Sequence, residues 1–142
     1  MVRGHDIYYE KMIDGIDIID QCDKSKQYTA IFDIDETIIN KNILIEPIYN
    51  LYIHAVKNNI RIVFITARDG NKDTIDFTIK QLKHFGLEYD LLYFRPPSMK
   101  NVEKFKLFAR MNVVENGHEP LFSIGDMHWD VGKFGGIPIL IF

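Results

Sequence analysis

The sequence predicts a three-layer, Rossmann-like α/β fold, in which a central parallel sheet of five strands has helices on both faces. From residue 28 onward, segments rich in β-branched and aromatic residues alternate with segments of helical periodicity. Strands that alternate with helices are typical of parallel pairing, with the sheet covered on both sides. The segment 61–65 is apolar nearly throughout, as expected for a strand near the sheet centre with two buried faces.

The first expected element is a helix over about 6–23, which would pack on the core or act as a partial lid. Glycine and asparagine residues then mark the points where later elements should stop. The whole chain, 1–142, is interpreted as one domain, with an N-terminal helical segment at 1–27 and a core at 28–142. The core elements are strand 28–34, helix 46–57, strand 61–65, helix 73–85, strand 90–94, helix 101–114, strand 120–124 and a buried final strand at 137–142.

Composition and charge narrow the class of protein. A hydrophobic content of 46% in 142 residues is enough for a substantial core. The net charge of -3 gives no overall basic field, so nucleic-acid binding would need a local patch. Cys22 is the only cysteine, which excludes an internal disulfide, and the N-terminus does not resemble a signal peptide. Because no apolar run approaches the roughly 20 residues of a membrane span, we expect a cytoplasmic protein without membrane contact.

Two aspartates follow the first apolar strand with one residue between them. Side chains alternate along a strand, so Asp33 and Asp35 should face the same side. Like charges this close are unfavourable unless a cation or a shared proton compensates, which is typical of a metal site or an acid/base site. Taken alone, the pair could equally be turn-forming or solvated carboxylates. Thr37 is expected to cap the turn that follows.

Polar residues also end two later strands. Thr66 follows the second strand, and Asp126 follows the fourth after Gly125. Ligands of open parallel sheets bind beyond the carboxyl ends of the strands, so these side chains should meet the two aspartates at one edge. Each of them alone could simply be a helix cap. Convergence of all of them on one edge favours a functional site.

These residues resemble the four motifs of the haloacid dehalogenase (HAD) superfamily, in the right order from Ala30 to the C-terminus. The motifs are Asp33-Ile34-Asp35-Glu36-Thr37, Thr66, a lysine before the fourth strand, and Gly125–Asp130. Glu36 after the second aspartate is most similar to the acid-phosphatase branches and to protein phosphatases with an Asp-x-Asp-Glu-Thr motif. The resemblance implies a HAD-like fold with strand order 5-4-1-2-3 and a Mg²⁺-dependent phosphohydrolase that acts on phosphate monoesters.

The resemblance also implies a role for each residue. Asp33 would be the nucleophile that forms an aspartyl-phosphate, and Asp35 the general acid and base. Mg²⁺ would be held by Asp33, the backbone carbonyl of Asp35 and the carboxylate of Asp126, with Asp130 either a further ligand or a support for the others. The residues implied for phosphate binding are Thr66, Ala67, Arg68 and Lys100.

The catalytic lysine has three candidates between the third and fourth strands. Lys106 is preferred because, with Arg110 four residues later, it resembles a Lys-x-x-x-Arg segment of the acid-phosphatase branch. Lys100, near the helix start and closer to a strand end, is the rival, and Lys104 is the third. Each of them would otherwise be a solvated helix residue.

The resemblance places only a short flap at 38–47, with no segment long enough for a cap domain. An open site would admit a small phosphomonoester, a nucleic-acid end or a phosphoprotein, and a homo-oligomer is compatible with it. Two alternatives are a phosphotransferase and a HAD-like binding module without turnover. A local basic rim could bind a polyanion, and its candidates are Arg68, Arg95, Lys100, Lys104, Lys106 and Arg110.

Overall fold

A five-stranded parallel sheet forms the centre of the molecule. The computed structural model describes residues 2–142, with side chains from residue 6 onward. The strand order is β5-β4-β1-β6-β7. If these five strands are numbered 1 to 5 in chain order, this is the predicted order 5-4-1-2-3 read from the other edge, so the predicted fold class and strand order are confirmed. The strands are β1 (Thr29–Phe32), β4 (Arg61–Asp69), β5 (Leu91–Arg95), β6 (Pro120–Gly125) and β7 (Ile137–Leu140).

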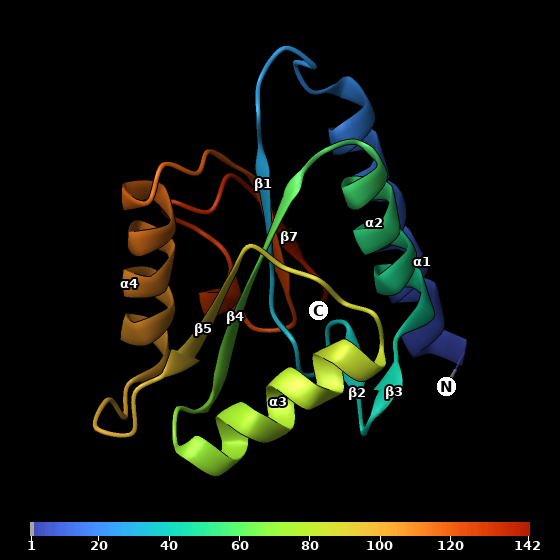
Figure 1. The fold of residues 1–142 in the computed structure, drawn as a ribbon. Helices are drawn as coiled ribbons and strands as arrows, with labels where there is room; N and C mark the ends of the chain where they lie inside the picture. The colour runs from blue at the N-terminus through green and yellow to red at the C-terminus, as the bar shows by residue number, and fades with distance from the viewer. Residues whose placement is uncertain (1) are drawn as a thin grey trace.

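Helices cover both faces of this sheet, as Figure 1 shows. α1 (Val2–Gln21) and α2 (Glu46–Lys57) pack against each other on one face, and α4 (Val102–Glu115) lies on the other. α3 (Lys72–His84) crosses the lower end of the molecule in this view, near a small antiparallel hairpin of β2 (Ile39–Asn40) and β3 (Ile43–Leu44). This hairpin occupies the segment for which the sequence predicts a flap.

Alternation along the strands divides the core in two. On β1, Ala30 and Phe32 belong to the larger cluster beneath α1 and α2, whereas Ile31 belongs to the smaller cluster beneath α4. β4 repeats the pattern, with Phe64 in the larger cluster and Val63 in the smaller one. Both strands are therefore buried on two faces, as the apolar run at 61–65 predicts.

Three strand boundaries differ from the prediction by two residues or more, and the others shift by at most one. β1 ends at Phe32 rather than at residue 34, because the amides of residues 37–39 turn back onto the Ile34 carbonyl. β4 continues to Asp69, four residues beyond its predicted end, with a register shift against β5 after Thr66. The predicted buried strand at 137–142 is wrong in part: β7 lies at the sheet edge and leaves Ile137 49% exposed.

The carboxyl ends of the strands point toward the lower end of Figure 1, where the hairpin and α3 lie. A hydrogen bond from Gln81 on α3 to Asn42 in the hairpin turn joins these two elements. Among the helices of the described residues, we find none with the length and apolar character that crossing a membrane requires.

Candidate active site

Asp33 lies directly beyond β1 and is 9% exposed. It follows Ile31 by two residues, so its side chain points to the α4 side of the sheet. Its amide donates to the Ile124 carbonyl of β6 at 3.0 Å, and one of its carboxylate oxygens accepts from the Thr37 hydroxyl at 3.2 Å. The turn after β1 therefore fixes the aspartate that the sequence predicts as the nucleophile.

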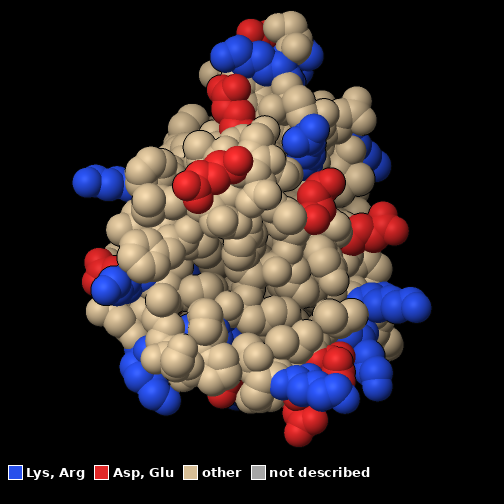
Figure 2. All heavy atoms as spheres, turned by 60° about the vertical axis from the view of Figure 1, so that its left-hand side comes forward, with Lys and Arg blue, Asp and Glu red and all other residues tan. Residues whose placement is uncertain are grey.

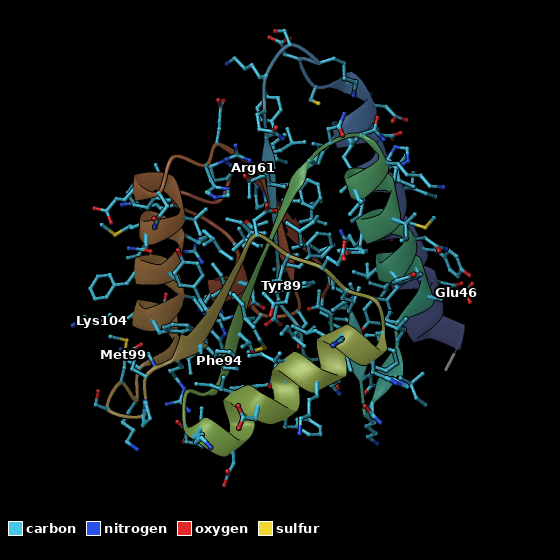
Figure 3. All side chains as sticks on the ribbon, in the orientation of Figure 1. Glu46, Arg61, Tyr89, Phe94, Met99 and Lys104 are labelled. Atoms are coloured by element: carbon cyan, nitrogen blue, oxygen red, sulfur yellow. The ribbon has the colours of Figure 1, made fainter. Side chains whose placement is uncertain are left out.

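A buried lysine from α4 contacts this carboxylate. Lys106 Nζ lies 2.9 Å from Asp33 Oδ1 and 2.6 Å from Asp130 Oδ1, and it also donates to the Ile65 carbonyl at 2.9 Å. Lys104, two positions earlier on α4, points away from the sheet (Figure 3). Lys100 is exposed just before α4 begins. Of the three candidate lysines, Lys106 alone contacts the aspartates.

Three carboxylates meet beside this lysine. Asp33, Asp126 and Asp130 each offer one oxygen, and these oxygens lie within 4.8 Å of one another. Gly125 makes this approach possible, because a Cβ at that position would lie 2.3 Å from the Cβ of Asp130. Three carboxylates face one ammonium, so negative charge is in excess, and hard oxygen ligands of this kind suit a divalent cation.

Burial sets the ionisation of this cluster. It raises the pKa of Asp33 to about 8; the Lys106 ammonium opposes that shift, and the Asp130 carboxylate reinforces it. The pKa of Asp126 is also raised, again mainly by burial. Burial alone would lower the pKa of Lys106, but the Asp33 and Asp130 carboxylates outweigh it and raise that pKa. The lysine therefore keeps its charge, and Asp33 and Asp126 favour a proton or a cation.

Asp130 is 5% exposed, and both of its carboxylate oxygens have partners. One lies against Lys106 Nζ, and the other accepts from the Met127 amide at 3.0 Å. This arrangement favours the alternative in which Asp130 supports the lysine and the loop after β6 rather than binding an ion itself. Arg110, one turn beyond Lys106, holds the same loop by donating to the carbonyls of Trp129 at 2.7 Å and Lys133 at 2.8 Å.

Asp35 is held by an arginine from β4. Arg68 donates from Nε to one Asp35 oxygen at 2.9 Å and from Nη2 to the other at 2.7 Å. Its Nη1 group donates to Thr78 and Gln81 on α3, at 2.9 and 2.8 Å. All these contacts place Arg68 as a bridge between Asp35 and α3. The sequence carries no signal of this bridge, because Thr78 and Gln81 resemble ordinary polar helix residues.

The remaining predicted residues lie at different depths. Thr66 is fully buried, and its hydroxyl oxygen accepts from the Arg68 amide at 3.1 Å. Ala67 lines the cavity that holds Asp33 and Asp35, and neither Thr66 nor Lys100 is among its lining residues. The hydroxyl–phosphate contact expected of Thr66 stays a prediction.

The predicted basic rim is wrong for two of its six members. Lys106 and Arg110 are buried, at 2% and 5% exposure. Arg68 is committed to Asp35 and α3, and Arg95 donates to the carbonyls of Ala67 and Met99. Spacing alone could not show this, because a buried paired arginine and a solvated one have the same sequence pattern. Figure 2, a view over α4 and β5, likewise shows charges of both signs around an uncharged centre.

A Rossmann-like sheet with a buried lysine and clustered carboxylates at its carboxyl edge is the arrangement that the resemblance to the HAD superfamily implies. The family profile of HAD superfamily subfamily IIIB, described as acid phosphatase, matches residues 41–135, about two thirds of the chain. The chain belongs to this family. The matched segment contains Thr66, Lys106, Asp126 and Asp130 and begins after the first aspartate motif.

One similar solved structure is a chain of the Pnkp1/Rnl/Hen1 RNA repair complex. It shares 16% sequence identity with this chain at a TM-score of 0.64, which supports the fold alone. The match covers 83% of this chain and 43% of that one, so this chain spans less than half the length of its structural relative. No curated protein matches the sequence.

Proposed function

We propose that the chain is a Mg²⁺-dependent phosphohydrolase that cleaves phosphate monoesters through an aspartyl-phosphate on Asp33. The observation that carries this proposal is the group of Asp33, Asp126 and Asp130 around Lys106 at the carboxyl edge of the sheet. A phosphate monoester resists hydrolysis because an anionic nucleophile must approach an anionic group, so fixed cations have to offset charge first.

The donor set fits Mg²⁺, which prefers hard oxygen ligands. Asp33 and Asp126 would hold the ion together with the backbone carbonyl of Asp35, and Asp130 would support them through Lys106. The bound ion would offset the charge of the phosphoryl group and lower the pKa of Asp33. Lys106 contributes a second, permanent positive charge next to the nucleophile.

The residues divide the chemistry between them. A carboxylate oxygen of Asp33 attacks phosphorus, the bond from phosphorus to the leaving oxygen breaks, and Asp35 gives that oxygen a proton. Asp35 then takes a proton from water, which attacks the same phosphorus. The phosphorus–oxygen bond to Asp33 breaks, so Asp33 is restored and inorganic phosphate leaves. Arg68 holds Asp35 at the site, and one of its two contacts has to open so that an Asp35 oxygen can carry the transferred proton.

Replacing the nucleophile tests this assignment. The Asp33→Asn variant should release no phosphate from an aryl phosphate while keeping the circular dichroism spectrum of the wild type. In the wild type, acid quench during turnover of a radiolabelled ester should leave label on the protein that hydroxylamine removes. Asp17→Asn, an exposed aspartate on α1, is the matched control and should behave as wild type.

Four results would contradict the proposal. Turnover by Asp33→Asn would remove the nucleophile, and undiminished turnover in EDTA would remove the metal. Phosphate that appears on an added alcohol rather than in water would instead support the phosphotransferase alternative. An intact, Mg²⁺-binding protein that hydrolyses no ester would support the binding-module alternative.

A further inference from the structure

The cavity at the active site has one acidic side and one apolar side. Its volume is about 230 Å³, and it opens beside Asp33 and Asp126. Its apolar wall consists of Ala67, Val102, Met127 and Trp129. These four residues come from β4, from the first turn of α4 and from the segment after β6, and they line the same cavity as Asp33.

Hydrogen bonds fix the position of the apolar wall relative to the acidic residues. Asp130 accepts from the Met127 amide, and Arg110 donates to the Trp129 carbonyl. The His128 ring packs against the Trp129 ring, with centroids 4.9 Å apart. Met127 is 40% exposed, which leaves its side chain available to a ligand. The loop that supplies Asp126 therefore also presents a fixed apolar surface.

The charges around the cavity disfavour a polyanion. Asp35 and Glu36 also line it, and Lys106 is the only basic residue that lines it among those whose side chains the structure describes. Arg68 and Arg95, which the sequence suggests for substrate binding, are occupied by protein partners. A nucleic-acid end would bring further phosphates toward acidic side chains, and no arginine of the described side chains lines the cavity to receive them.

We propose that the apolar wall, with Met127 and Trp129 at its centre, binds the leaving group and selects phosphomonoesters with an uncharged, aromatic leaving group. This inference rests on the proposed hydrolase function and adds the substrate class. Contact with an aromatic group removes apolar surface from water on both sides, and a planar ring can pack against the indole of Trp129. A small aliphatic leaving group gains little from this wall, and a polyanionic one is repelled.

The test compares each variant with the wild type on three esters: naphthyl phosphate, ethyl phosphate and an oligonucleotide with a 5′-phosphate. In Met127→Ala and Trp129→Ala, kcat/KM should fall about tenfold for naphthyl phosphate and less than about twofold for ethyl phosphate. Trp129→Leu keeps an apolar side chain for packing and should show the same selective loss. Phe108→Ala removes an exposed aromatic residue of α4 outside the cavity and should leave kcat/KM unchanged for both naphthyl phosphate and ethyl phosphate.

The wild type should also prefer naphthyl phosphate to the oligonucleotide, with little dependence on salt. Preference for the oligonucleotide together with a steep loss of activity in salt would overturn the inference in favour of nucleic-acid ends. An equal loss on naphthyl and ethyl phosphate in the variants would overturn it as well, because the wall would then only support the fold. A wild type inactive on every ester would remove the proposed function and this inference with it.

Discussion

Arg68 contacts both carboxylate oxygens of Asp35. This geometry favours a role in positioning Asp35 over a role in binding the substrate phosphate. A residue that binds substrate phosphate would mainly affect KM, whereas a residue that positions the general acid would mainly affect kcat. Because Arg68 is occupied by Asp35 and α3, we expect Arg68→Met to lower kcat, on the order of 10²-fold, with KM nearly unchanged. Steady-state kinetics on an aryl phosphate measures both constants.

Two further variants, a conservative one at Arg68 and one at another arginine, serve as controls for this prediction. Arg68→Lys keeps the charge but cannot form the bidentate pair, so it should recover only part of kcat. Arg61→Met removes an exposed arginine at the opposite end of the sheet (Figure 3) and should leave both constants unchanged. A rise in KM at constant kcat in Arg68→Met would instead return Arg68 to the phosphate-binding role that the sequence suggests.

The choice of Lys106 shows how far single residues can be predicted. The Lys-x-x-x-Arg spacing correctly points to a lysine and an arginine one turn apart on the same helix. It could not show that both are buried, because charged residues are rarely buried unless paired, and the partners come from distant segments. Asp33 is 73 residues away from Lys106 in the chain, and only the folded sheet brings the two together.

At the scale of elements, α4 organises the site through two cations. Lys106 binds the side chains of Asp33 and Asp130. Arg110 donates to two backbone carbonyls in the segment between β6 and β7. Arg110→Met would leave two carbonyl groups without their charged donor. We expect it to lower the free energy of unfolding by about 3 kcal/mol and to weaken Mg²⁺ binding by roughly tenfold.

Denaturant unfolding and calorimetric titration of Mg²⁺ measure these two effects separately. Guanidinium ion added to Arg110→Ala should restore part of the Mg²⁺ affinity, because it can donate to the same two carbonyls; a merely structural role would show no such rescue. Lys57→Met, at the exposed end of α2, is the control and should match the wild type in both measurements. Unchanged Mg²⁺ affinity in Arg110→Met would show that the loop holds its shape without the arginine.

The order and type of the main elements could be read from periodicity, but their ends could not. β4 continues to Asp69 because Arg68 is anchored to Asp35 and the chain then pairs again with Arg95 of β5, neither of which is a local signal. β7 is partly exposed because it is an edge strand, and no further strand of the described residues pairs with its outer side. The position of α3, across the end of the sheet, depends on side-chain contacts with the hairpin and with Arg68.

At the scale of the whole molecule, two cores fix the sheet so that its carboxyl edge collects residues from separate chain segments. The larger core joins α1 and α2 to the sheet, and the smaller one joins α4. Asp33 and Asp126 come from neighbouring central strands, and Lys106 comes from the helix over the second core. The proposed Mg²⁺ site would therefore exist only in the folded chain, so binding of the ion would be coupled to global stability.

This coupling predicts that Mg²⁺ raises the melting temperature. A ligand that binds only the folded state at a hundredfold excess over its Kd stabilises that state by about 2.7 kcal/mol, which is roughly 10 °C for a chain of this size. Differential scanning calorimetry with Mg²⁺ and then with EDTA should show this rise and its reversal. Asp126→Asn removes one carboxylate of the cluster and should lose most of the rise, whereas Asp17→Asn on the exposed side of α1 should keep it. An equal rise in Asp126→Asn would mean that the ion binds elsewhere, since loss of a ligand cannot leave the differential affinity for the folded state unchanged.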